Sequence, residues 1–204
     1  MAASLLTEGL EDLGLTPTPD RIGKIQLLYR SLVRWNRVVN LTAVKDETGF
    51  VTVHVLDSLA IHPYLRGSDI LDVGTGGGFP GLPLAIFFPA LRFVLLDAAA
   101  KKIRFVRQMA LELGLTNVEA IHARIENYAA EPGFDTIVTR AFADAGRGFA
   151  QSHHLLAPGG KFLAMKGRYP EKELAALADR RHRVMPLRVP GLEAERHLIE
   201  ITQH

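Results

Sequence analysis

Apolar residues follow two different spacings along the chain, and the change between them falls near residue 68. Before this point they recur every three or four residues, which is the spacing of the buried face of a helix. The first such stretch covers Leu5 to Leu13, with Ser4 placed to cap its start and Gly14 to end it. The second follows Thr18, a favourable N-cap, and carries a proline in its first turn.

A break at Asn40–Thr42 separates this second helix from a third helical stretch, which runs from about Asp46 to Leu65. We therefore expect residues 1–67 to form an N-terminal helical extension. We expect residues 68–204 to form one compact domain, since a chain of this length suits one domain plus an extension.

After residue 68, short apolar runs alternate with segments of helical length. The runs that predict strands are 70–73, 93–96, 118–121, 136–139 and 162–165. The helical segments are 81–88, 99–113, 143–156 and 171–181. This alternation is typical of βαβ units and predicts an α/β fold with a mostly parallel sheet. Two last runs, 183–189 and 197–202, are joined by too short a connection for a crossover and predict an antiparallel hairpin.

The most distinctive segment is the loop after the first predicted strand, Asp69-Ile-Leu-Asp-Val-Gly-Thr-Gly-Gly-Gly-Phe-Pro-Gly81. Its glycines allow tight turns and let a ligand approach the main chain where no Cβ intervenes. The helix that follows offers backbone N–H groups to a polar ligand. Part of the loop, Gly76-x-Gly78-x-x-Gly81, also matches the weak dinucleotide fingerprint, so NAD remains open on the glycines alone.

Two residues near this loop favour S-adenosyl-L-methionine (SAM) over a dinucleotide. Asp72, ahead of the glycines, can accept the ammonium group of SAM directly or through water. Pro80 removes an N–H that a pyrophosphate would use. Asp97, at the end of the second predicted strand, can accept from ribose hydroxyls, although it would suit NAD equally well. We therefore predict a Rossmann-like, SAM-dependent methyltransferase.

The composition of the chain excludes several kinds of site and location. The sequence has no cysteine, which excludes disulfides, zinc–thiolate sites and a cysteine nucleophile, and we expect no metal site. No apolar run reaches the ~18 residues of a membrane span. Acidic residues interrupt the first apolar stretch, so we expect no signal peptide, no membrane association and a cytoplasmic location. The net charge of +2 permits an anionic partner without requiring one.

Short segments spread over nearly the whole chain carry a resemblance to one family. They are Asn36–Thr42, His54–Ser58, Leu71–Pro83, Leu96–Asp97, Lys101–Phe105, Arg140–Ala141, Pro158–Gly160 and Lys166–Gly167. Together and in this order they resemble the bacterial 16S ribosomal RNA guanine-N7 methyltransferases, also known as the glucose-inhibited division protein B family. The resemblance implies a class I methyltransferase fold, SAM as cofactor, and a guanine near the decoding region of 16S ribosomal RNA as substrate, in free RNA or in the small ribosomal subunit.

The resemblance also assigns roles to individual residues. In the cofactor site, Gly74 and Phe79 would line the methionine end and Asp97 the ribose, while Ile125 and Glu126 would flank the adenine. The complete expected cofactor site is Asp72, Gly74, Gly76, Phe79, Asp97, Ile125, Glu126 and Arg140.

Cations and polar residues would surround the reaction itself. Arg140 and Lys166 end the fourth and fifth predicted strands, where open α/β sheets bind ligands. With Asn40 they form the expected catalytic set. The expected RNA contacts are His54, Lys101, Lys102, Arg124, Lys166 and Arg196. A structural histidine is the alternative for His54, and a solvated helix face is the alternative for the two adjacent lysines.

Other functions stay open at this point. The residues alone do not separate an RNA methyltransferase from one that acts on a small molecule or a protein. A nucleotide-binding oxidoreductase or regulatory domain, and a domain that binds without catalysis, are further alternatives. We expect a monomer.

Overall fold

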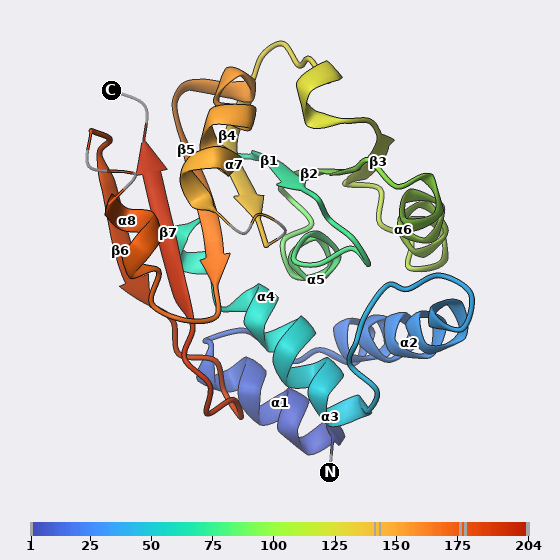
Figure 1. Cartoon of the computed structure of the whole chain (residues 1–204). Helices are drawn as coiled ribbons and strands as arrows, with labels where there is room; N and C mark the ends of the chain where they lie inside the picture. The colour runs from blue at the N-terminus through green and yellow to red at the C-terminus, as the bar shows by residue number, and fades with distance from the viewer. Residues whose placement is uncertain (1, 141, 143, 176, 178, 203–204) are drawn as a thin grey trace.

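One β-sheet forms the centre of the fold. The computed structural model describes residues 2–140, 142, 144–175, 177 and 179–202. Within them, seven strands form one sheet in the order β3-β2-β1-β4-β5-β7-β6. The first five are parallel, and β7 runs antiparallel to both of its neighbours (Figure 1). The predicted α/β fold with a mostly parallel sheet and a C-terminal antiparallel hairpin is confirmed.

The strands and helices have the following bounds. The strands are β1 (Asp69–Val73), β2 (Arg92–Asp97), β3 (Val118–His122), β4 (Phe134–Thr139), β5 (Leu156–Lys166), β6 (His182–Pro186) and β7 (His197–Thr202). The α-helices are α1 (Ala2–Asp12), α2 (Pro19–Asn36), α3 (Glu47–Gly49), α4 (Asp57–Leu59), α5 (Gly81–Phe87), α6 (Ala100–Glu112), α7 (Ala145–Ser152) and α8 (Glu171–Ala175). Short 3-10 helices are η2 (His62–Tyr64), η3 (Ile125–Asn127) and η4 (His153–Leu155), and η1 (Phe50–Leu56) is a π-helix.

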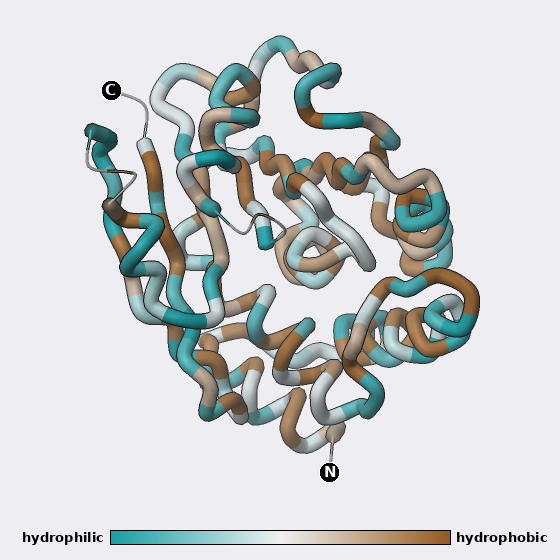
Figure 2. Tube along the Cα trace, in the orientation of Figure 1, coloured by the Kyte–Doolittle hydropathy of each residue, from teal (hydrophilic) through white to brown (hydrophobic). Residues whose placement is uncertain are grey.

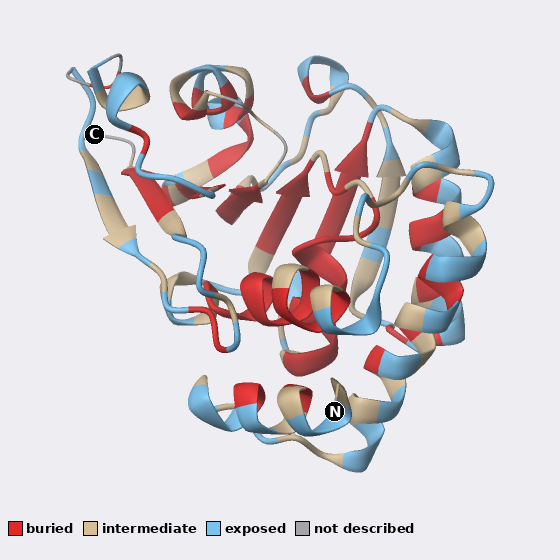
Figure 3. Cartoon of the chain, turned by 60° about the horizontal axis from the view of Figure 1, so that its bottom comes forward, coloured by how far each residue is buried: buried red, intermediate tan, exposed pale blue. Residues whose placement is uncertain are grey.

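Both faces of the sheet are covered, which explains the continuous apolar runs of its strands. Successive side chains point to opposite faces, so Ile70 belongs to the buried cluster that includes residues of α1, α2, η1, α5 and α6, whereas Leu71 belongs to a second cluster that includes residues of α7. The central strands are accordingly buried, and the outer faces of the helices are exposed (Figure 3).

The N-terminal helices share the core of the sheet domain. Leu6, Leu28 and Phe50 belong to the same buried cluster as Phe79 and Phe93. Apolar and polar residues alternate around α1 and α2, as expected for helices with one buried face (Figure 2). The division at residue 68 stays a prediction, since no gap in the core marks it.

The helix starts were predicted with mixed success. Thr18 caps α2, because its Oγ1 accepts from the backbone N–H of Arg21 at 3.3 Å, and Gly14 ends α1 with a φ of +71°. The N-cap predicted at Ser4 is wrong. The helix already starts at Ala2, and the Ser4 hydroxyl instead donates to Glu8 one turn later.

The third helical stretch is helical over nearly its predicted range, but two later helices were predicted with wrong bounds. The third helical stretch contains the π-helix η1 between α3 and α4, which the apolar spacing did not indicate. The segment predicted as a helix over 143–156 is helical from Ala145, and β5 already begins at Leu156 because this residue pairs with Phe134 before a register shift in β4. The segment predicted as a helix over 171–181 is helical over Glu171–Ala175. In the part of the chain that the structure describes, no helix is both long and apolar enough to cross a membrane.

Candidate active site

The glycine loop links the end of β1 to the start of α5. Gly74, Gly76 and Gly78 have φ values of +69°, +59° and +86°, which L-residues with a side chain rarely adopt. The N–H groups of Gly74 and Thr75 both donate to the carbonyl of Leu96, so the loop is fixed to β2. The predicted tight turn therefore depends on glycine at these positions.

Space beside this loop differs from one glycine to the next. A Cβ on Gly76 would meet nothing closer than a backbone oxygen of Gly74 at 3.9 Å, so a ligand has room to approach the main chain here. A Cβ on Gly81 would lie 2.7 Å from Leu95 and 2.9 Å from Asp72, because α5 packs directly on the sheet. One glycine thus leaves space for a ligand, and the other permits close helix–sheet packing.

Asp72 is buried near the end of β1, and its two carboxylate oxygens have different surroundings. Its Oδ2 accepts from the Thr75 hydroxyl at 2.7 Å and from the Gly81 N–H at 2.9 Å. Its Oδ1 is buried without a hydrogen-bond partner among the described residues. Burial raises the pKa of Asp72 to about 6, against the lowering effect of the Thr75 and Gly81 hydrogen bonds. An unpaired buried carboxylate oxygen is costly, and a bound ammonium group would satisfy it.

Asp97 ends β2 and fixes both the glycine loop and the start of α6. Its Oδ2 accepts from the Gly76 N–H at 2.9 Å, and its Oδ1 accepts from the Ala99 N–H at 2.8 Å. The ammonium group of Lys102 lies 4.0 Å from Oδ2. An ionised carboxylate offers about four lone-pair sites, so Asp97 can still accept from ribose hydroxyls while it holds Gly76.

Arg140 follows β4 and is anchored to the N-terminal helices. Its Nη1 donates to the Val53 carbonyl at 3.0 Å and to the Asp57 carboxylate at 3.4 Å. Its Nη2 lies 3.2 Å from Nδ1 of His54, and its guanidinium carbon is 5.7 Å from the centre of the Phe79 ring. A guanidinium has five N–H donors, so these three hydrogen bonds to described residues leave two donors that can bind a substrate.

His54 is buried and stacks on Phe79, with ring centres 4.5 Å apart and planes 13° from parallel. Burial and the nearby Arg140 lower the pKa of His54 to about 3, so the ring is neutral at physiological pH. Because Arg140 donates to Nδ1, the proton sits on Nε2, which lies 2.6 Å from the Thr42 hydroxyl and donates to it. The structure thus ties His54 into the protein, and its predicted RNA contact would carry no positive charge.

Asp57 joins two arginines that lie far apart in the sequence. It is buried at the start of α4, and its Oδ1 accepts from Nε of Arg196 at 3.1 Å while Oδ2 faces Arg140. Burial raises the pKa of Asp57, and the charges of both arginines act against that rise. Arg196, predicted as an RNA contact, is therefore connected to Arg140 through this carboxylate.

Lys166 ends β5 and is held by the protein as well. Its Nζ donates to the carbonyl of Phe142 at 3.0 Å and forms an ion pair with Glu173 at 2.8 Å. The same Glu173 oxygen accepts from the Ala145 N–H at 2.7 Å. Lys166 therefore fastens the segment after β4 to α8. Ala141, the second residue of the Arg140–Ala141 motif, lies outside the described residues.

The Asn40–Thr42 loop lies against the glycine loop. A Cβ on Gly77 would come within 3.5 Å of the Leu41 carbonyl. The side chain of Asn36 fixes this loop, since it accepts from the N–H groups of Leu41 and Thr42 and donates to the Thr42 carbonyl. Asn40 itself is exposed. The position of Asn40 beside the glycine loop supports its expected catalytic role.

The remaining predicted residues surround these groups. Ile125 is buried, whereas Glu126 is exposed with its carboxylate 3.4 Å from Gln151. Lys101 on α6 and Arg124 after β3 are exposed. Sequence reasoning missed Asn36, Thr42, Thr75 and Glu173 as individual contributors. The first three lie inside the quoted motifs, which was the available signal, and nothing in the sequence indicated Glu173.

Known proteins resemble this chain over nearly its full length. The family model described as rRNA small subunit methyltransferase G matches residues 21–199. A ribosomal RNA small subunit methyltransferase G from Methylococcus capsulatus is 49% identical over 201 residues, with 97% of both chains covered. The protein of the same name from Shewanella amazonensis is 40% identical over 205 residues, with 100% of both chains covered.

Solved structures with little sequence similarity share the fold. A SAM-dependent methyltransferase from Aquifex aeolicus has a TM-score of 0.57 at 19% identity, covering 76% of this chain and 92% of its own. A SAM-dependent O-methyltransferase from Thermotoga maritima has a TM-score of 0.55 at 17% identity, covering 72% of this chain and 64% of its own. The class I methyltransferase fold predicted from the sequence is confirmed.

Proposed function

The chain belongs to the rRNA small subunit methyltransferase G family, and from this premise we propose that it methylates N7 of a guanine in 16S ribosomal RNA. It is a SAM-dependent rRNA methyltransferase, so the dinucleotide reading of the glycine loop does not apply. We also propose that the protein acts as a monomer, on 16S RNA that is either free or assembled in the small subunit particle.

The observation that carries the cofactor site is the free oxygen of Asp72 beside an open stretch of glycine backbone. Asp72 and Asp97 offer acceptors to the two polar ends of the cofactor, the amino acid and the ribose. The backbone at Gly74 and Gly76 and the ring of Phe79 would line the space between them. Ile125 and Glu126, after β3, would flank the adenine.

The chemistry fits an acceptor that needs no deprotonation. When bound, SAM supplies a methyl group on a sulfonium centre. Guanine N7 has an in-plane lone pair and no proton, so its methylation needs no general base. The titratable side chain stacked on Phe79 is His54, and the lone pair on its Nδ1 is already taken by Arg140. His54 therefore has no free site with which to accept a proton.

Positioning is then the task of the protein. Orientation of reactants can supply ~7–11 kcal/mol of a barrier. Arg140 is held by three acceptors and keeps two N–H donors, which can bind guanine O6 or a phosphate of the substrate. The exposed Lys101, partly exposed Lys102 and exposed Arg124 would contact RNA phosphates at the same edge of the sheet. Lys166 and Arg196 would hold in place the protein groups that form this edge.

Mapping of modified nucleotides tests the proposal. Small subunits and free 16S RNA, each isolated from cells that lack the protein, would be incubated with purified protein and SAM. Nuclease digestion and mass spectrometry should then reveal one new 7-methylguanosine. Methylation at another atom, or of a metabolite or protein only, would refute the assigned substrate. A variant with Gly76→Val, which places a side chain at the open backbone, serves as the inactive control.

A further inference from the structure

A pocket of about 270 Å³ lies at the opposite end of the strands from Arg140 and Lys166. Its lining comes from segments far apart in the sequence: Arg66, Gly159, Arg181, His182, Arg183, Glu200 and Thr202. Arg66 comes just before β1, and Gly159 lies near the start of β5, whereas the proposed reaction takes place where these strands end. Ligand pockets that enclose whole small molecules are commonly ~300–1,000 Å³, so this one suits a smaller group.

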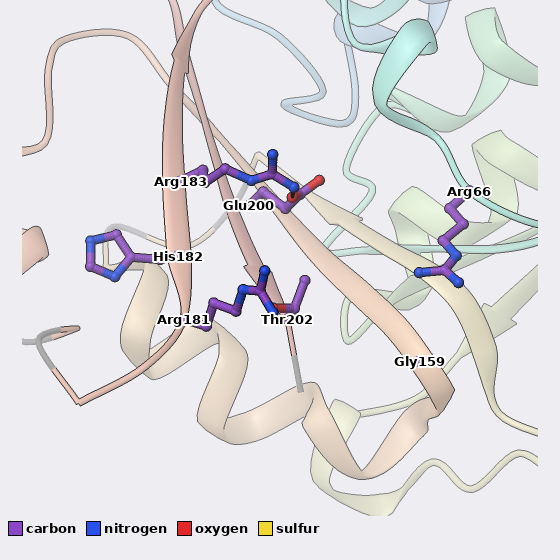
Figure 4. A pocket seen from close by; sticks show the side chains of 7 residues that line it. All are labelled: Arg66, Gly159, Arg181, His182, Arg183, Glu200 and Thr202. Carbon is purple, nitrogen blue, oxygen red and sulfur yellow. Dashed lines mark ion pairs between the residues drawn. The ribbon is translucent and has the colours of Figure 1, made fainter. Parts of the chain in front are cut away.

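The lining of this pocket is dominated by guanidinium groups. Figure 4 shows Arg66 extending from across the pocket toward Arg181 and Arg183, with the His182 ring on the other side of β6. Arg183 pairs with the Glu200 carboxylate at 3.0 Å. Arg66 and Arg181 have no carboxylate within ion-pair distance in the described parts of the chain.

Glu200 does not neutralise this charge, because it is already shared. Its second oxygen pairs with Lys161 at 2.8 Å. Although burial alone raises the pKa of Glu200, the hydrogen bond and charge of Lys161 together with Arg183 lower it, so the carboxylate is ionised. Among the described residues that line the pocket, one carboxylate thus faces three arginines, and Lys161 beside the pocket pairs with the same carboxylate. Like charges gathered in this way repel one another, and a bound anion would relieve the repulsion.

The backbone around Arg66 is fixed rather than free. Its N–H donates to the buried Thr136 hydroxyl at 2.9 Å, and that hydroxyl donates back to the Arg66 carbonyl at 2.7 Å. The tip of the side chain lies over the Pro158–Gly160 turn, 3.9 Å from where a Cβ on Gly159 would stand. Gly159 has a φ of +74°, and this turn is one of the motifs to which the proposed reaction gives no role.

We propose that this pocket binds a phosphate group, supplied by the backbone of the same RNA whose guanine reaches Arg140. This inference rests on the proposed function. Planar guanidinium groups bind phosphate oxygens through paired, charge-assisted hydrogen bonds. From Lys161, beside the pocket, to Lys166 at the reactive edge, β5 spans ~17 Å at ~3.3 Å per residue. An RNA segment of several nucleotides can therefore contact both ends of the sheet and hold the substrate in register.

Single charge removals at matched positions test the assignment. Arg66→Gln and Arg181→Gln remove the two arginines that lack a carboxylate partner. Arg30→Gln removes the same charge from an exposed position on α2 and is the control. RNA affinity would be measured by fluorescence anisotropy of a labelled 16S fragment across a salt series, with thermal unfolding of each variant as a check on folding.

Each pocket variant should weaken RNA binding roughly 5- to 20-fold at low salt. The log–log salt slope should become shallower by about 0.7, the value expected for one lost phosphate contact on a single strand. The control variant should change neither quantity as much. Equal effects from all three substitutions, or none from the pocket variants, would overturn the proposal.

A second arm separates the possible sources of the phosphate. Inorganic phosphate would be titrated at constant ionic strength while thermal unfolding is followed. A saturable rise in melting temperature that is lost in Arg66→Gln, with RNA affinity unchanged in that variant, would mean that the pocket binds free phosphate and not RNA. Methylation of 16S RNA by the wild-type protein is scored separately. If the wild-type protein does not methylate 16S RNA, the proposed function is refuted. If it does, but the pocket variants bind RNA as tightly as the wild type, only the assignment of the pocket is refuted.

Discussion

Replacing Asp57 by Asn tests whether the N-terminal helices hold Arg140 in its working position. The substitution keeps the shape of the side chain and removes the charge that Arg140 and Arg196 share. Removing one partner of a fully buried ion pair costs about 3–5 kcal/mol. The Asp57 side chain is 4% exposed, but the arginine side chains are 27% and 18% exposed, so water can partly replace the lost charge. Both arginines also keep other acceptors, including Val53 and Glu195.

We therefore expect a loss of about 1–3 kcal/mol in the free energy of unfolding, with a decrease of roughly 2–4 °C in melting temperature for each kcal/mol. SAM affinity should decrease less than the methylation rate, because Asp57 makes none of the described contacts to the glycine loop and reaches the expected cofactor site through Arg140 alone among the described contacts. The single-turnover methylation rate should decrease by about 10- to 100-fold, since small displacements of positioning groups are costly. These quantities come from urea unfolding, calorimetry with SAM and rapid-quench methylation.

Asp69→Asn is the matched control for this experiment. Asp69 also pairs with an arginine, Arg92 at 3.0 Å, but both side chains are substantially exposed and lie where β1 and β2 begin, away from the site. Exposed pairs contribute about 0–1 kcal/mol. If Asp57→Asn were no more destabilising than this control and methylated RNA at the normal rate, the proposed support of Arg140 would be wrong.

The other predictions concern charge and pH. His54 has its pKa lowered to about 3, so between pH 3 and 6.5 the unfolded state binds more protons and stability falls on acidification. Unfolding of His54→Gln across this range should show a weaker decline, by up to ~1.4 kcal/mol per pH unit, and identical curves would contradict the buried neutral histidine. The pKa of Asp72 is raised to about 6, so the SAM affinity of the wild type should decrease as the pH falls through 6. At pH 8, Asp72→Asn should bind SAM at least ~10-fold more weakly than the wild type, and its affinity should not depend on pH in this way. Calorimetry measures both affinities. The single-turnover rate with bound RNA should be nearly flat from roughly pH 6.5 to 9, because N7 methylation has no essential base. A rise of slope one over that range would instead reveal such a base and exclude N7 as the acceptor.

The parts of the fold that the sequence predicted have local causes. β1 and β2 are rich in apolar residues on both faces because both faces of each strand are covered, and Asp72 interrupts the apolar run of β1. The glycine loop was evident because positive φ values select glycine, and Thr18 was recognisable as a cap because its hydroxyl replaces a missing backbone acceptor.

The contacts that surround the site were not predictable in the same way. Arg140, Asp57 and Arg196 meet across 83 and 139 residues of chain, and no local pattern relates their positions. Lys166 was predicted as a contact for substrate from its place at a strand end, but its partner Glu173 lies on a short helix whose length the sequence overestimated. Such partners depend on how separate elements pack, which spacing within each element does not encode.

The π-helix η1 makes the number of residues as important as their identity. A helix of this kind is an α-helix widened by about one residue, and the carbonyl of Val53 within it serves Arg140. If the same residues formed a regular α-helix, the extra residue would turn everything that follows by about 100°, since an α-helix has 3.6 residues per turn. Asp57 would then face away from Arg140, although every side chain of the site would still be present. The π-helical backbone of this segment therefore sets the orientation of Asp57 as much as any side chain does.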